Sequence, residues 1–264
     1  MPVSINDEYC GNNNCTSWYG VSLGEDDEYH KFMQKEVAER LYDESGHTDF
    51  SEHLRGLSLT GMGKDNLEAV LNSENQEERD WAIGEAIAEA FLIRKHGVIF
   101  PWNMERDKRN PRGSLPGADI VGFIHTGSGY KLAFGEVKTS SEDRYPPQVM
   151  SGRSGNLGYQ IDDLVTNLST IFQLLYWLHP RCKNTEFQEA YNASVTAYLN
   201  SGNKDVSIFG VLIRDTPPNQ LDLQKRGNSL GEKVTTPTSC TLIAIHLPCK
   251  ICDLPGIMQG GVAS

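Results

Sequence analysis

The chain has 264 residues, 22% of them charged, and a formal net charge of −11 at neutral pH. That length allows one large or two small domains with a well-formed core. The negative balance argues against a protein that coats nucleic acid non-specifically. No apolar run approaches the roughly 20 residues of a membrane span, and the opening residues MPVSINDEYC lack the basic and apolar segments of a secretory signal. We therefore expect a cytoplasmic protein with no membrane contact.

The first part of the chain is polar and acidic. Residues 1–28 predict an irregular arm or a first edge strand, and the apolar spacing within residues 30–42 predicts a helix. Residues 43–64 are rich in Gly, Ser, Thr and His, which predicts loops and at most one short strand. We treat residues 1–75 as an N-terminal acidic and helical region, a candidate partner surface, and residues 76–264 as the core. The two together are expected to form one compact domain.

The strongest helix signal covers residues 76–96. Acids fill the first turn and bases the last, which complements the helix dipole, and Gly97 is a suitable C-terminal cap. We expect the buried stripe of this helix to contain Trp81, Ala88 and Phe91 or Leu92. The next residues, 98–100, predict a short strand that ends at Pro101.

Two acids of this helix are candidates for a site. Glu85 and Glu89 lie four residues apart and therefore on one face, among small and apolar neighbours. Gly84 would let the helix lie close to a sheet, which would bring Glu85 near the hairpin that follows. We choose Glu85 as the functional acid and keep Glu89 as the second choice.

A hairpin is predicted by two apolar, β-branched runs, residues 118–126 and 130–138, joined by a Gly-Ser-Gly turn. Side chains alternate along a strand, so Glu136 and Lys138 project from the same face. Asp119, at the start of the first run, can approach Glu136. Two acids and a lysine on one face make a poor core and a good metal site. The alternative is a surface hairpin with one ion pair worth under about 1 kcal/mol.

The remainder of the chain alternates helices and strands. Residues 140–158 are rich in Ser, Pro and Gly and resemble the flexible segments that close over sites. One long helix is predicted for residues 157–178 and another for 186–200, followed by buried strands at 207–214 and 241–247 with a polar loop between them. Three aromatics of the long helix are expected to lie in the core, with a base-stacking platform as the less favoured alternative: Phe172, Tyr176 and Trp177.

Polar residues around the hairpin are candidates for contacts with nucleic acid. Basic residues bind phosphates, and they gather before the hairpin and in the segment after it; the equally weighted alternative is a solvated loop with no ligand. Gln160, near the start of the next helix, is included only because of the family resemblance given below. The candidate nucleic-acid-binding residues are Arg106, Lys108, Arg109, Arg112, Arg144, Arg153 and Gln160.

The succession of a helix acid, PGADIVGF, FGEVK and a helix opening with Gln resembles the PD-(D/E)XK, or restriction-endonuclease-like, nuclease superfamily. The resemblance covers roughly residues 77–178. It implies an α/β fold with a mixed central β-sheet flanked by helices, and a metal-dependent nuclease whose expected substrate is DNA. It matches Asp119 and Glu136 to the acids, Lys138 to the lysine and Glu85 to the helix acid of the family.

The chemistry of these residue types supports the same assignment. Phosphodiester hydrolysis needs a nucleophilic water and stabilisation of developing negative charge, and a divalent cation on hard oxygen ligands supplies both. We expect Mg²⁺, with Mn²⁺ able to substitute, on Asp119, Glu136 and the backbone carbonyl of Val137, completed by Glu85 directly or through water. Lys138 would orient the attacking water and stabilise charge on the phosphate.

A narrower resemblance is to the nuclease subunit of Hachiman-type anti-phage systems, which implies a superfamily-2 helicase partner. An alternative function is a catalytically silent nuclease-like module that binds nucleic acid or a partner protein. A zinc site is a weaker alternative, because the chain has a single Cys-x-x-Cys pair near a histidine and no second pair at a suitable spacing. Its residues would be His246, Cys249 and Cys252, with Cys240 nearby.

Overall fold

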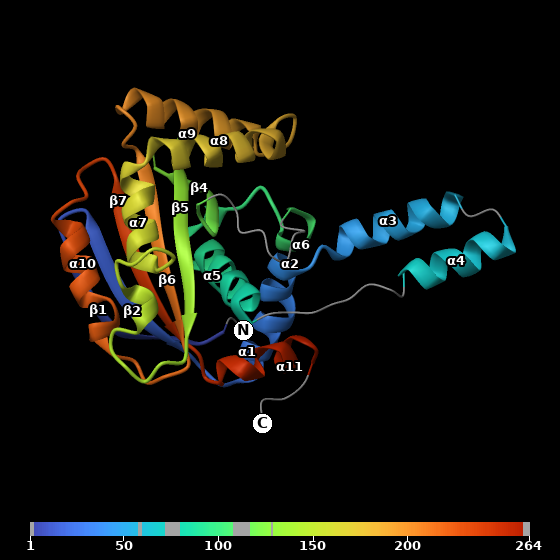
Figure 1. Ribbon diagram of the computed structural model, residues 1–264, viewed down its shortest axis with the longest axis horizontal. Coiled ribbons are helices and arrows are strands. Elements are labelled where there is room, and N and C mark those ends of the chain that lie inside the picture. Colours follow the sequence, from blue (N-terminus) through green and yellow to red (C-terminus); the bar gives the residue numbers. More distant parts are fainter. Residues whose placement is uncertain (1–2, 58–59, 72–79, 108–116, 128, 261–264) are drawn as a thin grey trace.

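The computed structural model describes residues 3–57, 60–71, 80–107, 117–127 and 129–260. Within these residues a seven-stranded mixed sheet has the order β1-β2-β7-β6-β5-β4-β3, and helices cover both of its faces (Figure 1). This confirms the expected α/β class with a mixed central sheet. None of the described helices combines the length and the apolar character needed to cross a membrane.

Parallel pairing joins the four central strands, β2, β7, β6 and β5, whereas β1, β4 and β3 pair antiparallel with their neighbours. The central β6 is buried along its whole length, as its apolar sequence predicts. The strands are β1 (Ile5–Asn13), β2 (Thr16–Leu23), β3 (Val98–Ile99), β4 (Ile120–Thr126), β5 (Gly129–Ser140), β6 (Val206–Arg214) and β7 (Ser239–His246).

The N-terminal segment contributes more to the sheet than the sequence suggested. Residues 1–28 were expected to supply at most an edge strand, but β1 and β2 form a hairpin, and β2 lies inside the sheet against β7. Asn14 makes the turn with a φ of 50°, a conformation that Asn tolerates better than most residues. The polar composition of β1 fits its place at the sheet edge.

The helices follow the predicted order with three corrections. Residues 43–64 are mostly helical, and the loop expected between β6 and β7 contains a helix. The helical segments are α1 (Asp27–Lys31), η1 (Phe32–Val37), α2 (Ala38–Leu41), α3 (Glu44–Leu57), α4 (Gly61–Leu71), α5 (Asp80–His96), α6 (Met104–Asp107), η2 (Gln148–Met150), α7 (Leu157–Thr166), α8 (Leu168–Cys182), α9 (Gln188–Asn200), η3 (Gln220–Asp222), α10 (Gln224–Gly231), η4 (Ile251–Asp253) and α11 (Leu254–Met258). Helices α3 and α4 extend away from the sheet and bury no residue among those described (Figure 1).

The third correction concerns the long helix expected over residues 157–178, which is two helices. Asn167 leaves the helical conformation, with φ −99° and ψ 100°, and its side chain accepts hydrogen bonds from the backbone N–H groups of Ser169 and Thr170. It thereby caps the start of α8. The continuous apolar spacing concealed this break, because both helices bury the same kind of stripe.

The two faces of the sheet carry different helices. Paired residues of neighbouring strands share a face, and the pairing of β5 with β6, β7 and β2 places Glu136, Gly210 and Trp18 in one row. A Cβ on Gly210 would meet Ile161 of α7, and one on Gly227 of α10 would meet the Trp18 ring. We call this side the α7 face. It carries Glu136 and is covered by α7 and α10.

The opposite side, the α5 face, carries the side chains of β5 that alternate with Glu136 and Lys138, among them Thr139. A Cβ on Gly84 would collide with the side chain of Thr139, so the glycine permits α5 to lie directly on the strand, as the sequence indicated. The predicted stripe of α5 is right for Ala88, Phe91 and Leu92, which are buried. It is wrong for Trp81, which is 44% exposed.

Substitution of Gly84 by alanine is expected to destabilise the protein by about 1–3 kcal/mol, because the added methyl overpacks against Thr139. This exceeds the gain in helix propensity of about 1 kcal/mol. The free energy of urea unfolding measures the effect. Thr139→Ala in the same chain should restore most of the loss, whereas a Gly84→Ala protein as stable as the parent would contradict the close contact.

Candidate functional site

The site forms where β4 ends and β5 continues. Ile120, the first residue of β4, pairs with Gly135, so in the described part of the chain β4 leaves the edge of β5 uncovered from Glu136 onward. Asp119 occupies this position. Its backbone N–H donates to the carbonyl of Gly135 at 3.0 Å, and its carboxylate oxygen Oδ2 accepts from the N–H of Val137 at 3.0 Å. The carboxylate is therefore fixed at the open edge of the strand.

Glu136 and Lys138 lie together on the α7 face of β5. Lys138 Nζ donates to Glu136 Oε1 at 2.6 Å, and the Glu136 residue is only 1% exposed. The second oxygen, Oε2, is buried without a hydrogen-bond partner among the described residues. A buried carboxylate oxygen without a partner is costly, which is typical of a group that awaits a ligand.

The electrostatic environment of Glu136 is unusual for a glutamate. Burial, and after it the neighbouring Asp119 carboxylate, raise its pKa to about 9 although Lys138 acts in the opposite direction. Burial outweighs the attraction of the lysine because it removes the water that would stabilise the carboxylate. Without a cation, the protonated form of Glu136 is favoured at neutral pH. The sequence therefore placed Asp119, Glu136 and Lys138 correctly in one cluster.

The two candidate helix acids have different surroundings. Glu89 is fully buried and forms an ion pair with Arg40 at 2.7 Å, and Arg40 also donates to the carbonyl of Trp102 at 2.6 Å. This contact gives Glu89 a structural role. Glu85 is also buried, beside Gly84 on the helix that covers the α5 face. Across the ranges described, no three His, Cys, Asp or Glu side chains form a group that could hold a metal, so Glu85 does not join the two hairpin acids here.

Gln160 lies on α7, the helix that covers the face of Glu136. Its side-chain oxygen Oε1 is buried and accepts no hydrogen bond from any described residue. The prediction that a polar residue of this helix faces the site remains a prediction, although an unsatisfied buried amide on the covering helix agrees with it.

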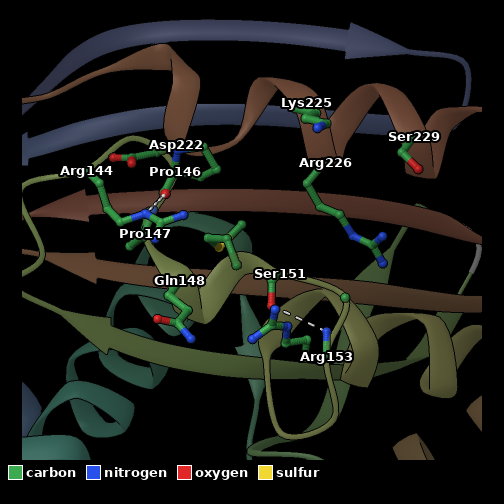
Figure 2. Close-up of a pocket in the computed structure, with 12 residues that line it drawn as sticks. Arg144, Pro146, Pro147, Gln148, Ser151, Arg153, Asp222, Lys225, Arg226 and Ser229 are labelled. Carbon is green, nitrogen blue, oxygen red and sulfur yellow. Dashed lines mark hydrogen bonds between the residues drawn. The ribbon is translucent and has the colours of Figure 1, made fainter.

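The predicted basic residues fall into three groups. Arg106 forms ion pairs with Asp43 at 3.6 Å and with Asp107 at 3.2 Å. Arg144 and Arg153 line a cavity on the α7 face of the sheet (Figure 2). The remaining three, Lys108, Arg109 and Arg112, lie outside the described residues.

Sequence reasoning missed two cations and misplaced two aromatics. Lys225 and Arg226 line the same cavity as the two arginines, but they were assigned to a polar loop because α10 is short. Phe172 and Tyr176 were expected in the core, yet they are 68% and 75% exposed and stack on each other. Helix α8 packs through its other face, which includes the buried Leu174.

The alternative zinc ligands make other contacts. His246 is buried and donates from Nδ1 to the carbonyl of Thr216 at 3.0 Å. The Cys249 thiol and the Tyr29 hydroxyl form a hydrogen bond at 3.3 Å. The Cys252 thiol interacts with Asp253. These residues pack and hydrogen-bond separately instead of converging on one point.

Comparison of the chain with protein-family models and with curated proteins finds no match to either.

Proposed function

We propose that this protein is a metal-dependent nuclease of the PD-(D/E)XK type that hydrolyses phosphodiester bonds, with DNA as its substrate. The observation that carries the proposal is the meeting of Asp119, Glu136 and Lys138 at the open edge of β5. The element order supports it: a helix with buried acids, a hairpin that carries the three residues, and then a helix that covers them.

The donor set suits a hard divalent cation such as Mg²⁺, or Mn²⁺ in its place. Two carboxyls lie close enough to raise one pKa, and Glu136 Oε2 has no protein partner among the described residues, so a positive ion would relieve both conditions. Asp119 and Glu136 would hold it with the carbonyl of Val137, which points to the same edge as the Val137 N–H. Glu85, which does not join these acids in the structure, is left out of the proposed ligand set.

When bound, the cation supplies a Lewis acid for the phosphate and lowers the pKa of a coordinated water. The residues of the chain supply the positioning. Lys138, half-buried beside Glu136, would orient the attacking water and place a positive charge near the phosphate oxygens, where negative charge develops. Because α7 covers this face, the lysine is partly shielded from solvent, which strengthens its interaction with an anion.

Cleavage of supercoiled plasmid by the purified protein tests the proposal. We expect nicked or linear products with Mg²⁺ or Mn²⁺ and none with EDTA. The alternative, a silent module, predicts DNA binding without cleavage in every metal. Oligonucleotides of DNA and RNA, single- and double-stranded, would then define the substrate.

We further propose that the nuclease acts in the cytoplasm as the effector of an anti-phage system and works with a superfamily-2 helicase. Support comes from α3 and α4, which project from the body and expose large apolar side chains, as partner-binding surfaces do (Figure 1). These side chains are Phe50, Leu57, Met62 and Val70. Co-elution with the helicase in size-exclusion chromatography, lost on Phe50→Ser with Met62→Ser, is the expected result. Failure to co-elute would remove the partner and leave the nuclease proposal intact.

A further inference from the structure

A cavity of about 600 Å³ lies on the α7 face between the segment that follows β5 and the residues of η3 and α10 (Figure 2). Four cationic side chains line it, together with a single acid, Asp222. The cations are Arg144, Arg153, Lys225 and Arg226. They come from two parts of the chain about 70 residues apart, so the fold assembles them, and their excess of positive charge contrasts with the net charge of −11 of the chain.

The acid in the wall is already balanced by another group. Asp222 is buried against Arg214, with Nε and Oδ2 3.5 Å apart, and Arg214 is itself fully buried. Arg226 is held in place because it pairs with Asp162 at 2.8 Å and donates to the carbonyl of Gly158. Asp222 therefore offsets little of the positive charge that the other side chains present to the cavity.

The two most available cations are Lys225 and Arg153. Both are exposed at the cavity wall, and within the described ranges neither takes part in an ion pair. Arg144 is also exposed, and the acid that pairs with it among the residues the structure describes is distant: Glu142, at 3.9 Å. Exposed cations without close acidic partners keep their charge available to an incoming anion.

The cavity is connected to the candidate nuclease site through β5. Ser140, the last residue of β5, lies on the same face as Glu136 and Lys138 and is paired with Arg214. The Arg214 guanidinium donates to the carbonyl of Ser140 at 3.0 Å and to that of Arg144 at 3.2 Å, which ties the strand end to the cavity wall. Four residues of strand span roughly 13 Å, so the strand end to which the cavity wall is tied lies about that far from Glu136.

We propose that this cavity binds a phosphate-bearing nucleotide of the substrate strand, at a position separate from the phosphate that is cleaved. The inference rests on the proposed nuclease function. Guanidinium groups bind phosphate oxygens in a bidentate manner, and lysine adds a point charge. The volume lies in the range of pockets that enclose a small organic ligand and exceeds what a phosphate alone needs. The cavity would thus hold the strand while the hairpin acids face the scissile bond.

Fluorescence anisotropy with a labelled single-stranded oligonucleotide tests this site in EDTA, where cleavage does not occur. The Arg153→Ala, Lys225→Ala double variant is expected to bind at least about tenfold more weakly. Its slope of log K against log salt should be shallower by about 1 to 2, because two phosphate contacts are lost. The matched control is Lys35→Ala with Lys183→Ala, which removes the same charge from exposed positions outside the cavity.

Equal binding by the cavity variant and the control variant would overturn the proposal, since only net charge would then matter. Probes with and without a 5′-phosphate distinguish the source of the phosphate: a loss confined to the phosphorylated probe identifies a strand end, and an equal loss identifies an internal phosphate. If inorganic phosphate competes but neither variant changes oligonucleotide binding, the cavity does not bind the substrate strand.

The outcomes for the two proposals are separable. Absence of cleavage under all metals, with binding that depends on Arg153 and Lys225, would leave the cavity assignment standing and remove the nuclease. Normal cleavage, with binding that the cavity variant does not change, would leave the nuclease standing and remove the cavity assignment.

Discussion

Lys138→Ala and Glu136→Gln proteins are expected to lose at least about a hundredfold in the rate of metal-dependent cleavage while they keep their fold. Loss of one preorganised charge-stabilising group costs about 10²–10³ in rate, and loss of a ligand to a cation removes the larger effect. The initial rate of plasmid nicking measures the change. Circular dichroism should show no difference in secondary structure.

The folds of these variants should survive for a specific reason. Lys138 donates its hydrogen bond to a glutamate whose pKa is already raised to about 9, so removal of the lysine leaves a neutral acid and not a buried charge. Suitable controls are Lys95→Ala and Glu189→Gln, which change exposed residues outside the site. Full activity in either site variant would contradict the assigned roles.

In EDTA, Glu136→Gln is expected to be more stable than the parent protein, with a difference that grows as the pH rises from about 5 to about 9. The sign follows from proton binding. Between the ordinary pKa of 4.5 and the folded-state pKa of about 9, the unfolded chain releases the Glu136 proton and the folded chain retains it. Raising the pH therefore favours unfolding of the parent, and glutamine cannot ionise.

Urea unfolding at pH 5, 7 and 9 measures this difference. One unit of pKa shift corresponds to about 1.4 kcal/mol, so we expect the advantage of the variant at pH 9 to exceed that value. Mg²⁺ should reverse the order, because a cation favours the ionised carboxylate and stabilises only the parent. Parallel pH profiles for the two proteins, or an equal response to Mg²⁺, would show that Glu136 is an ordinary carboxyl.

The sequence predicted the part of the molecule that local rules control. Two β-branched runs and a Gly-Ser-Gly turn predicted the hairpin of β4 and β5, and alternation predicted that Glu136 and Lys138 share a face. Both were confirmed. The placement of Asp119 was also right, because a residue just before a strand lies next to the partner strand once the register is set.

The rest depended on contacts that are distant in the sequence. The polar composition of residues 1–28 predicted an irregular arm or an edge strand, whereas β2 lies inside the sheet because it pairs with β7. The cationic cavity could not be foreseen, because Arg153 and Lys225 meet only after α7 and α10 pack on the same face. Similarly, burial of the α5 acids follows from how that helix is covered, which its sequence does not reveal.

The pairing of β2 with β7 also constrains how the molecule is made. Trp18 pairs with Leu242, so β2 can pair with β7 only after almost the whole chain has emerged from the ribosome. At about 5–20 residues per second, translation of the intervening segment takes roughly 11–45 s. During that interval β2 has an open edge that could pair with another chain, and nascent copies are then most vulnerable to aggregation. A nascent-chain complex stalled before β7 should therefore show a protease-sensitive N-terminal hairpin.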